Sequence, residues 1–448
     1  MRLGEKIGYG LGDTASSMLW KLFSVYLMFF YTDISGIDAW VVGVLFLVTR
    51  IWDSLLDPVV GLLCDRTRSR WGTFRPWLLW GALPFGVLGI LTFYMPEWSS
   101  GGKVVYATVT YSLMMIVYSS VNVPYAALLG VMSADPHERT VLAAFRMAFA
   151  AAGSMVVVLA VEALVKAFRP WAGSSGSWTA AVAVVAVVAV LLFFVTFATT
   201  RERIRPVRTE RHPVLGSLRD LLHNKPWLIL AGAAVCLQVF NAFRESGTIY
   251  FFKYCVAGET VGTMSFAGVA LTGSALFLAV GQLFNIAGIV LIPFAADRFG
   301  RRRTLVCALL LTAVFSFAFY FVRQGGYSLL FLAQALISLS VGGVLPLLWA
   351  MSADTADYAE QRSGRRDTGL IFSSYSMAQK MGWAVGSAAT AWILSLSGFE
   401  ANTVQSPAAL TVIGCLQSIF PALAALGTCV FILFYPCLLY TSPSPRDC

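Results

Sequence analysis

Charged residues are scarce in this chain of 448 residues, of which only 12% are Asp, Glu, Lys or Arg and 58% are hydrophobic. Its mean hydropathy is +0.74. A soluble protein carries about 25% charged residues, so this balance excludes an ordinary water-soluble domain. Histidine is rarer still: His137, His212 and His223 all fall outside the apolar runs. Their positions argue against a histidine-based metal site or proton relay inside a membrane.

Catalytic and ligand-binding motifs are also missing from the sequence. There is no P-loop, no HExxH and no nucleophile elbow, and the eight cysteines are scattered without ligand-like spacing. We therefore expect no enzyme, no cofactor and no metal beyond a coupling ion. Any transport must be driven by an ion gradient or by the gradient of the solute itself.

Long apolar blocks are what the chain does contain, each of about 20 residues and able to cross ~30 Å of hydrocarbon as a helix. We predict an all-α membrane protein with twelve transmembrane helices. The predicted spans are 8–32, 38–63, 77–95, 104–131, 142–165, 178–199, 227–252, 268–296, 304–322, 328–350, 368–396 and 408–436.

The basic residues outside these spans predict the orientation of the chain. Most of them lie at the N-terminus and in the even-numbered loops, and few lie in the odd-numbered loops. By the positive-inside rule, the N-terminus is predicted to be cytoplasmic. We expect a multi-pass protein of a bacterial inner membrane. The net charge of +9 reflects this bias and requires no nucleic-acid partner. We expect a monomer in the lipid bilayer.

Two short patterns recur in the same order along the chain. "DRTRSRWGTFRP" (65–76) follows the second span and "DRFGRRRTL" (297–305) follows the eighth, while "MSAD" closes the fourth and tenth spans. The repeat predicts two pseudo-symmetric six-helix halves. This arrangement resembles the major facilitator superfamily, in which the halves rock about a site at the membrane midplane.

The predicted domain boundaries follow from this repeat. We expect an N-terminal half at 1–200, a basic cytoplasmic linker at 201–225 and a C-terminal half at 226–436. The residues that open the two repeated loops are expected to act in conformational change, and they are Asp65, Arg66, Asp297 and Arg298.

The end of the chain does not read as natural protein. Residues 437–447, "CLLYTSPSPRD", match a translation of a common transposase sequencing adapter. We therefore expect 437–448 to be a sequencing artefact and the native C-terminus to be missing.

Charged residues inside the predicted spans are the strongest functional signal, because each costs about 2.5–3.5 kcal/mol at a span centre. Asp53 and Asp57 are four residues apart and share one helix face. Pro58 lacks an N–H, which frees the carbonyl of Ser54. These oxygens suit Na⁺, whereas a protonatable carboxylate suits H⁺. Alternatively, Arg50 simply neutralises Asp53.

Other polar residues in the spans are suited to binding a hydroxyl-rich solute. Asp13 and Ser17 form a second pair one turn apart, although Asp13 can also cap a helix or pair with a loop arginine. Asn122 can hydrogen-bond hydroxyls or only a neighbouring helix, and Tyr125 can stack on a sugar. Arg146 offers a fork of donors for hydroxyls or a carboxylate, unless it pairs with an acid near the loop.

Several longer segments together resemble the glycoside–pentoside–hexuronide:cation symporters, of which melibiose permease is a member. The segments are "GYGLGD" (8–13), "YLMFFYTDISG" (26–36), "LFLVTRIWDSLLDPVVGLLCDRTRSRWGTFRPW" (45–77), "VNVPYAAL" (121–128), "ERTVLAAFR" (138–146) and "DYAEQRSGRR" (357–366). The resemblance covers nearly the whole chain up to Pro436.

The resemblance implies roles for individual residues. It identifies Asp53 and Asp57 as the paired carboxylates of the cation site. Ser119 falls at the position of a hydroxyl ligand of that site, and Lys380 at the position of a lysine beside it. Leu56 stands in place of an asparagine beside the pair, which weakens the case for Na⁺ and strengthens that for H⁺.

The sugar site of the family is only partly retained. Arg146 matches a sugar-binding arginine, whereas Asn122 and Ser17 stand in place of sugar-binding aspartates. Asp13 belongs to the Gly-Asp motif of the family. These departures are consistent with a different glycoside, a pentoside or an anionic sugar in place of melibiose.

The expected function is therefore symport of a sugar with H⁺ or Na⁺ by alternating access. One alternative is a cation-coupled carrier of another amphiphilic solute, such as a lysolipid or a nucleoside. An alternative of another class is a membrane sensor that no longer transports.

Overall fold

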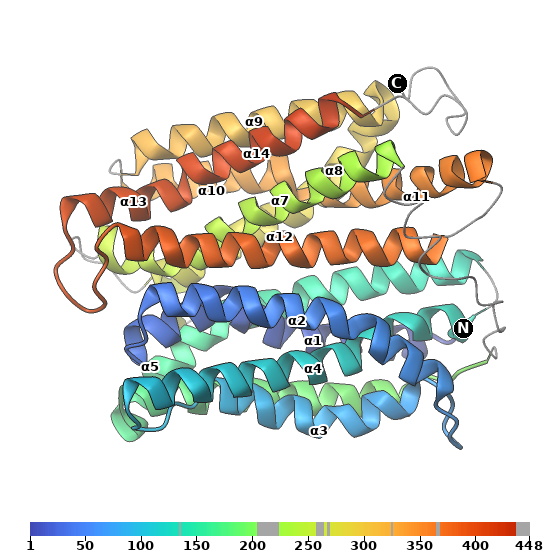
Figure 1. Ribbon diagram of the computed structural model, residues 1–448, viewed down its shortest axis with the longest axis horizontal. Coiled ribbons are helices and arrows are strands. Elements are labelled where there is room, and N and C mark those ends of the chain that lie inside the picture. The colour runs from blue at the N-terminus through green and yellow to red at the C-terminus, as the bar shows by residue number, and fades with distance from the viewer. Residues whose placement is uncertain are drawn as a thin grey trace. The chain divides into compact units, whose positions relative to one another are not determined.

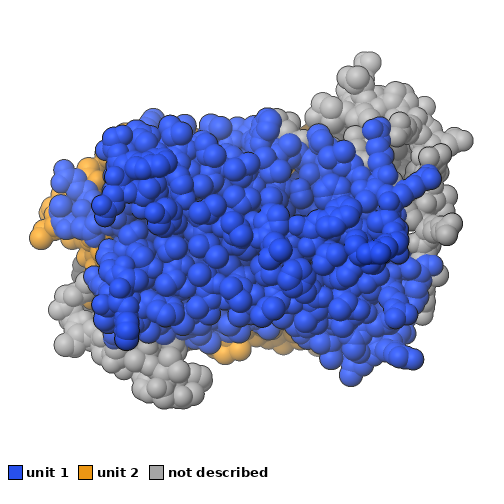
Figure 2. Space-filling view, turned by 90° about the horizontal axis from the view of Figure 1, so that it is seen from below, with its two compact units in different colours: residues 1–208, 259–276, 400–403 blue, residues 209–258, 277–399, 404–448 orange. Residues whose placement is uncertain are grey.

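The computed structural model describes residues 1–133, 136–203, 224–256, 264–266, 269–323, 326–363 and 368–435. Most of the predicted linker and the whole of 437–448 lie outside these ranges. The chain forms two compact units, coloured separately in Figure 2. The first contains residues 1–208, 259–276 and 400–403, and the second contains 209–258, 277–399 and 404–448.

The first unit is built from long helices that lie side by side (Figure 1). Helix α1 packs along α5, α3 packs against α4 and α5, and α2 packs against α4. The elements are α1 Leu3–Leu22, the π-helical segments η1 Phe23–Leu27 and η2 Phe30–Ile34, α2 Ala39–Arg66, α3 Arg75–Thr92, α4 Ser100–Met132 and α5 Pro136–Thr199.

The second unit is also helical. Helix α7 packs against α12 and α14, and α9 packs against α10 and α14. The elements are α7 Lys225–Tyr250, the π-helical segment η3 Phe251–Cys255, α8 Gly273–Phe299, α9 Arg301–Val322, α10 Tyr327–Gly342, α11 Val344–Ser363, α12 Thr368–Leu396, α13 Pro407–Gln417 and α14 Ile419–Leu433, with the first turn of α8 belonging to the first unit.

Local sequence explains where several helices begin. The Asp38 carboxylate accepts from the Trp40 N–H at 2.8 Å at the start of α2, and Asn224 accepts from the Trp227 N–H at 3.2 Å at the start of α7. Such side chains satisfy N–H groups that have no partner within the helix. The core of each unit is then filled by apolar residues at helical spacing.

Helix α5 covers two of the predicted spans. It runs past the expected loop after 165 and breaks at Gly173, whose backbone has φ 68° and ψ −168°. Glycine adopts this left-handed φ without the steric cost that a side chain would add. Close packing of α1 on α5 also depends on a glycine, because a Cβ at Gly153 would lie 2.8 Å from the Thr14 carbonyl oxygen.

The span predicted at 268–296 begins later than expected. Strands β1 Met264–Phe266 and β2 Val269–Leu271 form a short antiparallel pair before α8. The hydroxyls of Thr272 and Ser274 at the start of α8 donate to the Glu162 carboxylate of α5. These polar contacts fix the beginning of α8 beyond the predicted position.

The predicted all-α architecture is confirmed. Among the described residues, eight helices are long and apolar enough to cross a membrane. Two predicted spans are interrupted, at Gly343 between α10 and α11 and at Ser418 between α13 and α14. A Cβ at Gly343 would lie 2.8 Å from the Gly288 carbonyl oxygen, so α8 passes close to that interruption.

Candidate functional site: two polar centres in the first unit

A buried carboxylate and a buried hydroxyl meet between α2 and α4. Asp53 is 0% exposed and Ser119 is 1% exposed. The Ser119 hydroxyl donates to Oδ1 of Asp53 at 2.6 Å, within the range of a charge-assisted hydrogen bond. The structure therefore brings together two residues that the sequence predicted for one cation site.

Asp57 lies one turn beyond Asp53 on α2 and is half-buried. The helix continues through Pro58, which has no N–H to offer the carbonyl of Ser54. The Ser54 hydroxyl donates to the carbonyl of Arg50 at 3.0 Å. This turn of α2 therefore carries two carboxylates and a carbonyl that lacks its usual helical donor.

Arg50 lies beside Asp53, as the alternative interpretation of the sequence required. The guanidinium Nη1 is 4.0 Å from Oδ2 of Asp53, and Arg50 is 3% exposed. The same guanidinium lies over the ring of Trp20 from α1, with Cζ 4.3 Å from the ring centroid. The guanidinium of Arg50 therefore contacts both the ring of Trp20 and the carboxylate of Asp53.

A second polar centre joins α1 to α5. The Nε of Arg146 donates to Oδ2 of Asp13 at 3.0 Å, and their side chains are 31% and 14% exposed. Asp13 therefore pairs with another predicted binding residue and not with a loop arginine. The pair is partly open to solvent, which leaves it accessible to a polar solute.

Tyr125 supports this pair from α4. The Arg146 guanidinium lies 5.2 Å from the Tyr125 ring centroid. The Tyr125 hydroxyl donates to the carbonyl of Tyr9 at 2.6 Å, and the two tyrosine rings stack with centroids 4.8 Å apart. Tyr125 is 0% exposed, so its ring and hydroxyl are both engaged within the protein.

Ser17 and Asn122 are half-buried on α1 and α4. The Asn122 Nδ2 donates to the carbonyl of Tyr118 at 3.0 Å, which is a contact within its own helix. The interhelical contact that the sequence left open for Asn122 stays a prediction.

The remaining predicted residues are placed as follows. Lys380 is half-buried on α12 of the second unit. Arg66, Asp297 and Arg298 are exposed at the ends of α2 and α8, and the side chain of Asp65 lies outside the described residues. The structure therefore groups the predicted residues of the first unit and describes Lys380 only within its own unit.

The loop before α3 is held by a residue that sequence analysis missed. The Glu202 carboxylate accepts from the backbone N–H groups of Thr73, Phe74 and Arg75 at 2.8, 2.8 and 2.9 Å. A carboxylate at a helix N-terminus is favoured by the helix dipole. In the sequence Glu202 stands among arginines, which gave no sign that it binds a loop more than 120 residues away.

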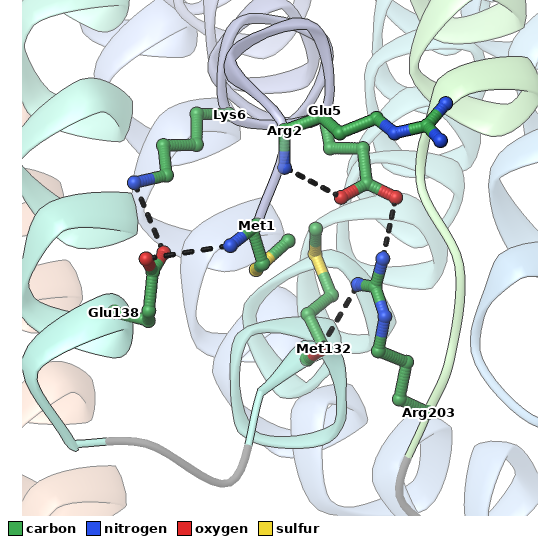
Figure 3. Close-up of polar contacts among 7 residues, drawn as sticks. All are labelled: Met1, Arg2, Glu5, Lys6, Met132, Glu138 and Arg203. Carbon is green, nitrogen blue, oxygen red and sulfur yellow. Dashed lines mark hydrogen bonds and ion pairs between the residues drawn. The ribbon is translucent and has the colours of Figure 1, made fainter.

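A cluster of polar contacts also ties down the start of α1 (Figure 3). Lys6 Nζ lies 3.0 Å from Oε2 of Glu138 at the start of α5, and Arg203 donates to Oε1 of Glu5 at 2.6 Å. The Lys6 ammonium, which hydrogen-bonds to Glu138, lowers the pKa of that half-buried carboxyl. The cluster links α1, α5 and the first residues of the linker.

The chain matches a known protein family over nearly its whole length. The family model for MFS/sugar transport proteins matches residues 8–437. The chain belongs to this family. The match confirms the predicted resemblance and the major facilitator fold, and it identifies a membrane transporter.

Individual relatives agree with this assignment. The chain is 36% identical to the putative glycoside/cation symporter YagG of Escherichia coli (strain K12), covering 97% of this chain and 92% of that protein. It is 34% identical to the isoprimeverose transporter of Lactiplantibacillus pentosus, covering 96% and 88%. The predicted function, cation-coupled sugar symport in a bacterial inner membrane, is therefore confirmed at this level.

A solved structure shares the fold at much lower identity. A structure from a study of substrate recognition in proton dependent oligopeptide transporters superposes with a TM-score of 0.70 at 12% identity, covering 97% of this chain and all of that one. At such identity the likeness shows the fold alone.

Proposed function

We propose that the two polar centres of the first unit are the linked cation and sugar sites of this symporter. The observation that carries the proposal is the fully buried Asp53 carboxylate in the interior of a membrane protein, which accepts a hydrogen bond from Ser119 at 2.6 Å. An ionisable group retained there marks an ion pathway by default. The partly exposed Asp13–Arg146 pair supplies the polar contacts that a sugar needs.

The proposed cation site consists of Asp53, Asp57 and Ser119. Carboxylate and hydroxyl oxygens are ligands for hard cations, and a carboxylate can equally take up a proton. The coupling ion is therefore Na⁺ or H⁺. Lys380 is proposed beside this site on the strength of the family resemblance, where its ammonium would compete with the ion for the carboxylates.

The proposed sugar site is centred on Arg146 and Asp13. The Nε of Arg146 donates to Asp13, and the two Nη groups of the same guanidinium are donors of the kind that adjacent sugar hydroxyls accept from, while Asp13 can accept from those hydroxyls. Ser17 and Asn122 extend the site along α1 and α4. The ring of Tyr125 lies against the Arg146 guanidinium and holds it in place.

Coupling follows from charge. A cation at Asp53 and Asp57 neutralises the two carboxylates, of which Asp53 otherwise attracts Arg50, and removes charge that disfavours the sugar-competent state. By linkage, each ligand then tightens the binding of the other by the same factor.

We further propose that the N-terminus is cytoplasmic and that residues 1–200 and 226–436 are the two halves that rock during transport. Asp65, Arg66, Asp297 and Arg298 open the equivalent cytoplasmic loops and are proposed to act in that motion. We expect a monomer.

The test is uptake by purified protein in liposomes, using radiolabelled isoprimeverose, a methyl glucuronide and melibiose. Each sugar is offered with an inward Na⁺ gradient, with an inward H⁺ gradient, or with neither. We expect accumulation of at least one sugar under one of the two gradients. Absence of gradient-dependent accumulation for every sugar would contradict the proposal.

A further inference from the structure

Three half-buried residues form a stripe along the middle of α1. Asp13, Ser17 and Trp20 are spaced by four and three residues, so they lie on one helix face. All three are half-buried, whereas the intervening residues at 15, 16, 18 and 19 are buried. Trp20 therefore continues the proposed sugar site by one further turn of the helix.

Trp20 is also in contact with α4. Its ring centroid is 5.4 Å from that of Tyr118, with the rings tilted by 39°. Tyr118 and Asn122 are one turn apart on α4, and both are half-buried. The two helices thus present an aromatic pair beside the polar residues of the stripe. Aromatic rings of this kind bind the apolar face of a sugar ring.

The indole of Trp20 lies over the buried guanidinium of Arg50, at 4.3 Å from Cζ to the ring centroid. Nη1 of Arg50 in turn lies 4.0 Å from Oδ2 of Asp53, whose Oδ1 accepts a hydrogen bond from Ser119. A continuous series of contacts therefore leads from the stripe on α1 to the buried carboxylate of Asp53. A cation–π contact is strongest when the guanidinium is desolvated, as it is here.

We propose that Trp20 stacks on the bound sugar and couples the sugar site to the cation site. This inference rests on the proposed function. When an ion neutralises Asp53, the carboxylate attracts Arg50 less and the guanidinium settles on the indole. The ring is then fixed in the orientation that receives the sugar. With Asp53 charged, Arg50 is drawn towards the carboxylate and the indole is less restrained.

The experiment measures the affinity of purified protein for the sugar of the panel that the wild type accumulates most. Affinity is determined without the coupling ion and with the ion at saturation, and the ratio of the two is the coupling factor. The variants are Trp20→Leu and Trp20→Phe. The matched control is Trp80→Leu, because Trp80 is 54% exposed on α3 of the same unit.

We expect Trp20→Leu to lower the coupling factor about 10-fold, since it removes the cation–π contact. Trp20→Phe retains an aromatic face and should restore most of the factor, and Trp80→Leu should leave it unchanged. If Trp20→Leu is not recovered as folded protein, Trp20→Met gives the same reading because it retains more side-chain volume without a ring.

Two outcomes overturn the inference alone. One is a wild-type coupling factor in Trp20→Leu, which would show that Trp20 does not link the cation site to the sugar site even if the sugar affinity falls equally in both conditions. The other is a loss of coupling in Trp20→Phe as large as that in Trp20→Leu. If the wild type accumulates no sugar under either gradient, the proposed function fails and this inference fails with it.

Discussion

The Asp13–Arg146 pair allows a quantitative prediction for sugar binding. Asp13→Asn removes the charge that orients the guanidinium while retaining the shape of the side chain. A hydrogen bond to a charged group is worth about 1.5–3 kcal/mol when buried, whereas exposed pairs contribute about 0–1 kcal/mol. With side chains 31% and 14% exposed and 3.0 Å between Nε and Oδ2, the pair lies between these limits. We expect a loss of about 1–2 kcal/mol, or about 5- to 30-fold in sugar affinity.

The assay is equilibrium binding of the accumulated sugar to purified wild type, Asp13→Asn, Arg146→Gln and the double variant. If Asp13 acts by orienting Arg146, the double variant should lose little more affinity than Arg146→Gln alone, because a cycle of mutations isolates the coupling between the two residues. Additive losses would show that the two side chains act independently. A sugar affinity within twofold of wild type in Asp13→Asn would show that the charge of Asp13 does not orient Arg146 for sugar binding.

Further predictions concern the loop before α3 and the start of α1. Gly72 has φ 115°, and a Cβ there would lie 2.5 Å from the Glu202 carboxylate. Gly72→Ala should therefore lower the midpoint temperature of thermal unfolding. Gly101→Ala is the control and should leave that temperature unchanged, because a Cβ at Gly101 meets open space. An unchanged midpoint in Gly72→Ala would contradict the packing of this loop. Because Lys6 lowers the pKa of Glu138 from its ordinary 4.5, the pair stabilises the folded state above pH 4.5, and this contribution is lost as the pH falls through the lower folded-state pKa. The midpoint of wild type should therefore exceed that of Glu138→Gln at neutral pH and approach it in acid; a difference that grew in acid would contradict this sign.

The helices could be predicted from sequence because the bilayer leaves the backbone few alternatives. Apolar blocks of about 20 residues and a few capping side chains are local signals. The break at Gly173 and the late start of α8 were not predictable in this way. Gly173 adopts a left-handed φ that an isolated glycine does not announce, and α8 begins where Thr272 and Ser274 meet Glu162 from a distant helix.

The candidate site was predictable in its members but not in its contacts. The spacing of Asp53 and Asp57 on one helix can be read directly, Arg146 stands out as a charged residue in a predicted span, and family resemblance supplied the role of Ser119. The partner of Asp13 could not be predicted, because Arg146 lies 133 positions away. Trp20 has the helical spacing of the site in the sequence, but its contact with Arg50 depends on how α1 and α2 pack.

If Asp53 binds the coupling ion, the variant Asp53→Asn should lose ion-driven transport. The measurement compares gradient-driven accumulation with sugar counterflow, which needs no net ion movement, in liposomes containing wild type or Asp53→Asn. The neutral amide retains the size of the carboxylate and an acceptor for Ser119, but it cannot take up a proton and is a weaker ligand for Na⁺. We predict that Asp53→Asn loses accumulation driven by either ion while counterflow persists. Accumulation at the wild-type level in Asp53→Asn would contradict the account.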